Sequence, residues 1–305
     1  MAVYEQSYQP FTGVLTPVRT RFLIIPRYAY RSVFESKLFV AFFAACFIYP
    51  LAAAILIYLK HNLTALTMLQ QSVGQLVAID GDFFYNFMLG QGALAFFLTV
   101  LVGPPLMAQD LANNALPLYL ARPFSRAEYL VGKASVLMIL LSLITWIPGL
   151  LLFGFQAYLD GGGWLGNFWW VALALFGSSW AWIICLTLLA LAVSSLLRWR
   201  TVASGALVAL MFVPMAFGEI VNNLFQTRMG HLLSFNALIR AVWSGLFRNF
   251  VVQTGHIRVE NRGRVVYEVF LNEPPLWASW LVLSLVCMVC VWLLARRVRA
   301  YEIVK

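Results

Sequence analysis

Six long apolar stretches dominate the pattern of hydrophobic and polar positions along the chain, and none of them contains a charged residue. They cover residues 38–59, 83–109, 134–157, 167–197, 201–218 and 274–295. A helix needs about 20 apolar residues to cross a hydrocarbon core about 30 Å thick. The stretches lack the alternating polarity of membrane barrels, and helices are the other spanning solution. The pattern therefore predicts an all-α polytopic membrane protein with six transmembrane helices.

Composition excludes a soluble protein. Of the 305 residues, 62% are hydrophobic and 11% are charged, whereas soluble domains are about 45–50% apolar and about 25% charged. The chain holds 21 Lys and Arg against 12 Asp and Glu. In a membrane protein this excess is a topology signal rather than a sign of nucleic-acid binding.

The positions of Lys and Arg predict the orientation. With the N-terminus in the cytoplasm, 14 of the 21 basic residues fall in cytoplasmic segments. Six of the other seven lie in one long outer segment, where the positive-inside rule is weak. We therefore expect both termini in the cytoplasm. The first 37 residues show no cleavable signal peptide, so we expect the first span to direct insertion.

Two regions outside the spans have sequence patterns of their own: the start of the chain and the segment between the fifth and sixth spans. Residues 1–37 are expected to form a cytoplasmic N-terminus with an amphipathic interface helix over 18–37, although these residues could simply begin the first span. Residues 219–273 are expected to form a small extracytoplasmic subdomain, with helices within 224–250. Alternating apolar residues on both sides of Asn261–Gly263 predict a β-hairpin there. Glu219 is a candidate outer gate, or else an interfacial helix cap.

The cytoplasmic segment 110–129, between the second and third spans, is the most informative. Asp110 is expected to end the second span and to cap a short apolar helix over 111–121. Arg122–Pro123 would end that helix, and Ser125 to Glu128 forms a capping box for the third span. A short apolar helix at the membrane surface suits docking to a soluble partner. The alternative is a membrane-parallel connector without a partner.

The same segment resembles the permease subunits of ABC-2-type transporters, in a run that begins at Gly103–Pro104 and ends at Gly132–Lys133. The resemblance assigns an ATPase-coupling role to the segment that holds Asp110, Leu111, Asn114, Leu118, Tyr119, Arg122, Pro123, Ser125, Arg126, Glu128 and Lys133.

This resemblance implies the transmembrane subunit of an exporter in a prokaryotic inner or plasma membrane. Two permease chains, identical or related, would pair with two separate ATPase subunits. The short helix would seat in an ATPase groove, and the basic start of the chain would pack beside it. ATP and Mg²⁺ would bind the partner, and this chain would bind no cofactor. An amphipathic or lipid-like substrate would move outward, and the second and fifth spans would face the dimer axis.

The residues themselves add limits on chemistry. The string nearest to a phosphate-binding loop is Gly132-Lys133-Ala134, which lacks the Ser or Thr that such a loop requires. Cys287 and Cys290 lie in an apolar run and are expected to be packing residues rather than a metal or redox pair. No ionisable residue falls in the middle of a span, which disfavours a proton-coupled carrier. The sequence predicts no metal site and no enzyme. A membrane scaffold that binds a partner through its outer subdomain is the alternative function.

Overall fold

The structure, a computed structural model, describes residues 24–62, 78–113, 126–197, 199–225, 227, 229–248, 255–261, 264–270 and 274–297. Within these residues, six helical segments are long and apolar enough to cross a membrane, as predicted. The elements, in chain order, are α1 (Ile24–Phe34), α2 (Lys37–Ala45), α3 (Ile48–His61), α6 (Gly81–Ala112), α8 (Arg126–Ile144), α9 (Trp146–Asp160), α10 (Gly162–Leu196), α11 (Arg200–Phe225), η2 (Met229–Leu233), α12 (Phe235–Leu246), β1 (Gly255–Asn261), β2 (Arg264–Phe270) and α13 (Leu276–Arg297).

Two of the six spans are each built from two helices. The first span combines α2 and α3, and the third combines α8 and α9. Pro50 and Pro148 are the third residues of α3 and α9. A proline has no N–H and its ring clashes with the carbonyl four residues earlier, so it is tolerated in a first turn and ends the helix before it. Each break lies just before a proline, whereas Pro104 and Pro105 lie inside α6 and Pro214 lies inside α11 without a break.

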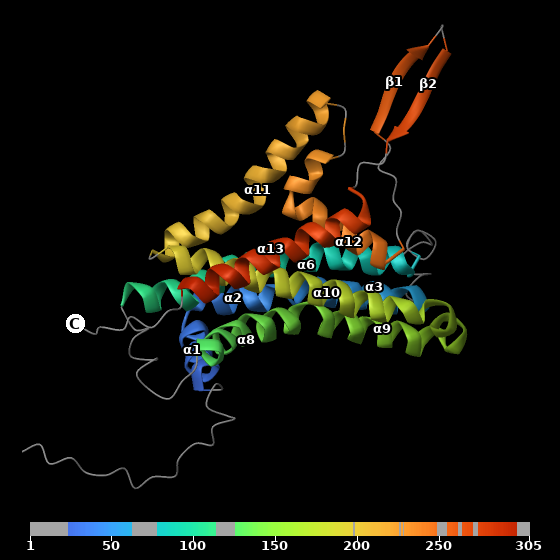
Figure 1. The fold of residues 1–305 in the computed structure, drawn as a ribbon. Helices are drawn as coiled ribbons and strands as arrows, with labels where there is room; N and C mark the ends of the chain where they lie inside the picture. The colour runs from blue at the N-terminus through green and yellow to red at the C-terminus, as the bar shows by residue number, and fades with distance from the viewer. Residues whose placement is uncertain are drawn as a thin grey trace, which may run out of the picture.

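Most of the spans run side by side, while α11 slants away from them toward its C-terminal end (Figure 1). One end of the bundle, termed the basic end, holds α1, the last turn of α6 and the first turn of α8. Its exposed cations are Arg27, Arg31, Lys37, Arg126, Arg200, Arg296 and Arg297. At the opposite end, His61 lies 3.9 Å from Asp160, and the Trp164 indole donates to the carbonyl of Ile79 at 3.0 Å.

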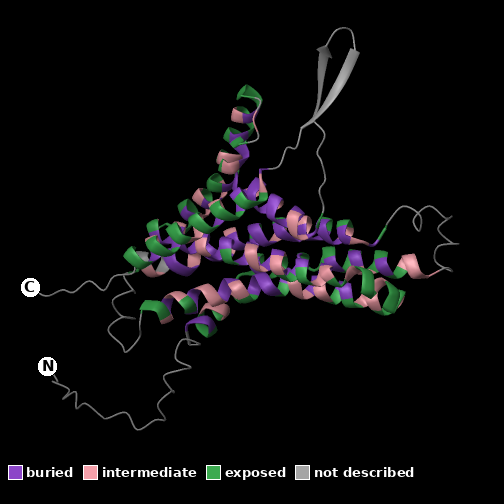
Figure 2. Cartoon of the chain, turned by 45° about the vertical axis from the view of Figure 1, so that its right-hand side comes forward, coloured by how far each residue is buried: buried purple, intermediate pink, exposed green. Residues whose placement is uncertain are grey.

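Helix α10 lies at the centre of the bundle and packs against α6, α8, α9, α11, α12 and α13. Buried residues follow the interior of the bundle, and exposed apolar residues cover its outside (Figure 2). In the most apolar part of α6, 61% of the residues are buried, and the share is the same in α10. The corresponding part of α11 is only 22% buried, and that of α13 is 28% buried. Helix α11 therefore leaves a long apolar face without a partner within the described chain.

Helix α12 belongs to the core of the bundle. Eight of its 12 residues are buried. The Trp243 indole donates to the carbonyl of Ser178 at 3.1 Å, and the Trp182 indole donates to that of Gly92 at 2.9 Å. A side chain at Gly92 would collide with the ring of Trp243, so only glycine lets α6 approach α12 this closely. The prediction of helices near the outer surface over 224–250 did not anticipate this burial.

The remaining elements lie at the margins of the bundle. Strands β1 and β2 pair antiparallel, from Gly255 opposite Phe270 to Asn261 opposite Arg264. Helix α1 packs against α8 and α2. It ends before Ser36, whose side chain accepts a hydrogen bond from the Phe39 amide and caps α2. Within the described part of the helix predicted over 18–37, α1 ends at Phe34 and only Lys37 belongs to α2; residues 18–23 lie outside the described residues.

Candidate functional site

The informative segment begins and ends at the basic end of the bundle. Helix α6 ends at Ala112, and α8 begins at Arg126. Residues 113–125, termed the connector, join the two helices, and residues 114–125 lie outside the described part of the chain. The short helix and the capping box at Ser125 therefore stay predictions. The roles of the other candidate residues on the connector also stay predictions, because these residues lie outside the described part of the chain: Asn114, Leu118, Tyr119, Arg122 and Pro123. Leu111 belongs to α6, and its side chain is not described.

Asp110 occupies a different position from the one expected. It lies inside α6, two residues before the end of that helix, so it does not cap a following helix. Its Oδ2 atom instead accepts a hydrogen bond from the Tyr129 hydroxyl at 2.6 Å and lies 2.8 Å from Lys133 Nζ. The last turn of α6 is thereby joined to the first two turns of α8.

These three residues, Asp110, Tyr129 and Lys133, are termed the polar clamp. Tyr129 and Lys133 are four residues apart on α8, which places them on one face of that helix. Tyr129 is 1% exposed, and the side chains of Lys133 and Asp110 are 9% and 15% exposed. Charge interactions strengthen where water is excluded, and a buried charge left without its partner is costly. The clamp therefore resists separation of α6 and α8 at the two ends of the connector.

Neighbouring contacts hold the clamp helices in place. The position of a Cβ on Gly103 of α6 lies 2.7 Å from the Ala190 side chain, so α6 lies close to α10 just before the clamp. Tyr30 of α1 donates its hydroxyl to the carbonyl of Val136 on α8 at 3.4 Å. Burial raises the pKa of the Tyr30 hydroxyl to about 12. A push on the connector would thus reach α6, α8, α10 and α1.

Arg126, Glu128 and Glu219 are the remaining described residues of the predicted site. Arg126 is exposed at the first position of α8, and Glu128 is partly exposed in the same turn, where a carboxylate favours a helix N-terminus. Glu219 is exposed on α11, roughly 28 Å along that helix from Arg200 at 1.5 Å per residue. Glu219 therefore lies far along α11 from Arg200 at the basic end.

Tyr129 is the residue that sequence reasoning did not single out. It lies within the run that resembles ABC-2-type permeases, but the sequence alone assigns it no role. Its four-residue spacing from Lys133 was the available signal, because two polar groups on one face of an apolar helix need a shared partner. The sequence could not show that this partner is Asp110 on another helix.

Cysteines and acidic residues offer no second centre in the parts of the chain that the structure describes. No group of three metal-ligating side chains is found among these residues. The Sγ atoms of Cys185 on α10 and Cys287 on α13 lie 3.5 Å apart, and all four cysteines are free thiols. Cys287 thus contacts another helix, and both thiols pack between α10 and α13.

Neither a model of a known protein family nor a curated protein sequence matches this chain.

Proposed function

We propose that this chain is the permease subunit of an ABC-2-type exporter, which moves an amphipathic or lipid-like substrate outward with ATP hydrolysed by two separate ATPase subunits. The polar clamp at the base of the connector carries this proposal. A loop that only joins two spans needs no buried ion pair at its base, and such a pair is costly to assemble in an apolar bundle. A loop that transmits force does need its two ends held together.

The mechanism follows from how the clamp ties the helices. The connector would seat in a groove of the ATPase and move when ATP closes the two ATPase subunits. Because Lys133 and Asp110 join α8 to α6, both helices would move as one body rather than separate. Helix α10 packs on α6 and α8, so the displacement would pass into the centre of the bundle.

The basic end would face the cytoplasm, and both chain termini would lie on that side. Helix α1 would lie along the inner membrane surface beside the ATPase. Its Arg27 and Arg31 are exposed while Ile25 is buried, as suits an interfacial amphipathic helix. Residues 219–273 would then lead to the outer side, with Glu219 as the candidate outer gate.

Helix α11 is the proposed contact with a second permease chain. Its apolar face includes Phe212 and Val213, which are 48% and 64% exposed, and the Cβ position of Gly205 has no atom within 4 Å. Small residues let membrane helices approach closely. The glycines of α6 are already used within the chain, since Gly90 lies against Tyr49 and Gly92 against Trp243. We therefore propose α11, rather than α6, as the principal dimer face.

Co-purification tests this function. The tagged chain would be purified in mild detergent from its native host, and stoichiometric partners identified by mass spectrometry. We expect an ATPase with a phosphate-binding loop to accompany the wild-type chain and the Arg297→Glu variant. The Arg126→Glu variant, at the edge of the connector, should lose it. A preparation that carries an exported protein and no ATPase would refute the proposal and favour a scaffold.

A further inference from the structure

A second feature of the basic end is a cavity of about 730 Å³ between α1, α2, α6 and α11. This volume lies within the range of about 300–1,000 Å³ that is usual for small-molecule sites. Two of its lining residues, Leu38 of α2 and Phe97 of α6, are 63% and 49% exposed. None of the polar clamp residues lines it, so it is distinct from the site described above.

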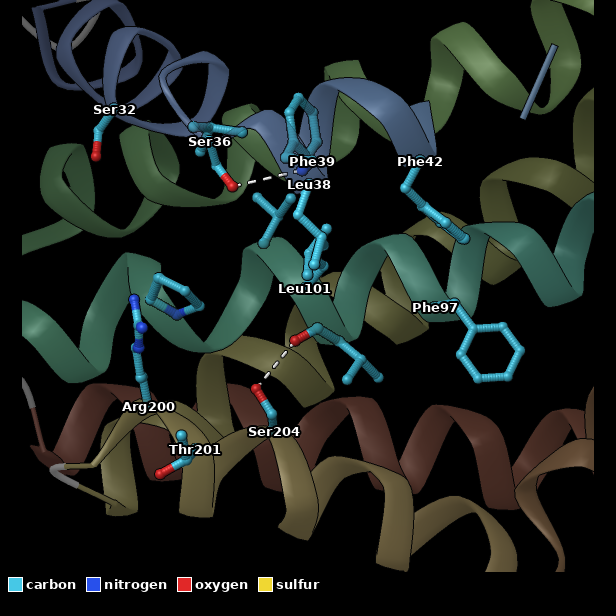
Figure 3. A pocket seen from close by; sticks show the side chains of 14 residues that line it. Ser32, Ser36, Leu38, Phe39, Phe42, Phe97, Leu101, Arg200, Thr201 and Ser204 are labelled. Carbon is cyan, nitrogen blue, oxygen red and sulfur yellow. Dashed lines mark hydrogen bonds between the residues drawn. The ribbon is translucent and has the colours of Figure 1, made fainter. Parts of the chain in front are cut away.

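The lining of this cavity changes from polar to apolar along the spans. Ser32, Arg200 and Thr201 lie toward the basic end of the cavity, and Phe42 and Phe97 lie at its far end (Figure 3). From Ser36 to Phe42 the helix rises roughly 9 Å. This distance matches the depth of about 5–10 Å over which a bilayer passes from headgroups to acyl chains. A ligand with a polar head and an apolar tail would fit this gradient.

Arg200 supplies the charge at the polar end. Its side chain extends from α11 toward α6 (Figure 3). Within the described residues, no ion pair joins Arg200 to a carboxylate. A guanidinium with free N–H groups matches a phosphate in charge and geometry.

Two serine hydroxyls that line the same cavity add hydrogen-bonding capacity. Ser36 Oγ accepts from the Phe39 amide at 3.4 Å, which leaves its O–H free to donate. Ser204 Oγ donates to the carbonyl of Val100 at 3.1 Å, which leaves its lone pairs free to accept. The polar end of the cavity can therefore bind both the phosphate and the hydroxyl groups of a headgroup.

We infer that this cavity binds one anionic membrane phospholipid. Arg200 holds the lipid phosphate, and the serine hydroxyls contact the rest of the headgroup. The part of an acyl chain nearest the headgroup lies along Phe39, Leu101 and Phe97. Anionic lipids of the cytoplasmic leaflet are attracted to basic residues of a protein at the membrane surface. Lys37 is a further exposed cation at the level of the headgroups. The lipid would fill the gap between α2 and α11 as a resident molecule. The inference does not depend on an ATPase partner.

Native mass spectrometry tests this inference directly. The delipidated chain in detergent would be titrated with dioleoylphosphatidylglycerol and, separately, with dioleoylphosphatidylcholine. We expect one phosphatidylglycerol per chain, bound about tenfold or more tightly than phosphatidylcholine, because the choline cation cancels the phosphate charge beside Arg200 and Lys37 and offers no hydroxyl group to the serines. Arg200→Gln should abolish the preference. Arg297→Gln, a matched control at the same end of the bundle, should preserve it.

A second variant separates the cavity from general surface charge. Leu101→Trp fills the apolar part of the cavity, and we expect it to weaken both lipids while Arg200 stays in place. Arg200 is exposed, so Arg200→Gln is not expected to disturb folding, and it keeps the test valid if Leu101→Trp misfolds. Equal losses from Arg200→Gln and Arg297→Gln would overturn the inference. So would lipid binding that a folded Leu101→Trp variant leaves unchanged, or a dimer that Leu101→Trp breaks while lipid binding persists.

Discussion

Replacement of Lys133 by methionine tests the role of the polar clamp most sharply. Methionine keeps most of the length of the lysine side chain and removes its charge. Asp110 would then stay buried with the Tyr129 hydroxyl as its described hydrogen-bond donor. Loss of one partner of a buried ion pair costs about 3–5 kcal/mol. We expect about 2–3 kcal/mol here, because the Asp110 side chain is 15% exposed and retains some water.

Thermal unfolding in detergent, followed by tryptophan fluorescence, measures this loss. At about 2.1 cal/mol/K of unfolding entropy per residue, 1 kcal/mol shifts the Tm of this 305-residue chain by about 1.6 °C, so we expect Lys133→Met to lower Tm by about 3–5 °C. The double variant Asp110→Asn with Lys133→Met leaves no unpaired charge and should recover most of the loss. A Lys133→Met variant as stable as the wild type would refute the clamp. Strictly additive losses in the double variant would also refute it.

Three further predictions follow from other parts of the structure. Charge reversal at Arg126 or Glu128 should abolish stimulation of the partner ATPase without loss of membrane insertion, measured by ATP hydrolysis and membrane fractionation; wild-type stimulation would contradict the coupling assignment. Gly92→Ala should lower stability by about 1–3 kcal/mol, because its methyl group collides with Trp243, whereas Gly205→Ala should leave monomer stability unchanged; equal Tm values for the two variants would argue against the packing of α12. Burial raises the pKa of Tyr30 to about 12, whereas an unfolded tyrosine ionises near pH ~10. Between pH ~10 and ~12 the wild-type chain should therefore lose stability relative to the Tyr30→Phe variant. A difference in Tm between the two chains that stays constant from pH 9 to 12 would refute this.

The spans could be read from the sequence because they depend on local chemistry. Charge-free runs of about 20 residues must cross the bilayer as helices. The breaks in two spans could not be read in the same way, because Pro50 and Pro148 lie in the first turns of new helices while Pro104 and Pro214 lie inside continuous ones. Only part of the pairing of Asp110 with Tyr129 and Lys133 could be predicted from the sequence. The four-residue spacing on α8 is local, but the choice of partner depends on how α6 packs.

The burial of α12 could not be predicted from its own residues. Arg240 and Arg248 made this segment resemble a surface helix. Its position depends on Gly92, which lies more than 140 residues earlier in the chain and leaves room for the Trp243 ring. Such complementarity between distant residues is a tertiary property. Hydrophobic periodicity predicts that α12 has a buried face, but it does not predict what covers that face.

Cross-linking from the connector tests the central claim most directly. A Leu118→Cys variant would be labelled with a maleimide photo-cross-linker in native membranes; Cys46, Cys185 and Cys290 are buried and Cys287 is half-buried, which favours labelling at position 118. Tyr158→Cys, at an 85% exposed position of α9 near the opposite end of the bundle, is the matched control. We predict that position 118 captures an ATPase with a phosphate-binding loop, in a yield that changes with ATP, and that position 158 captures none. Capture of lipid alone at position 118, or of the same proteins at both positions, would contradict the account.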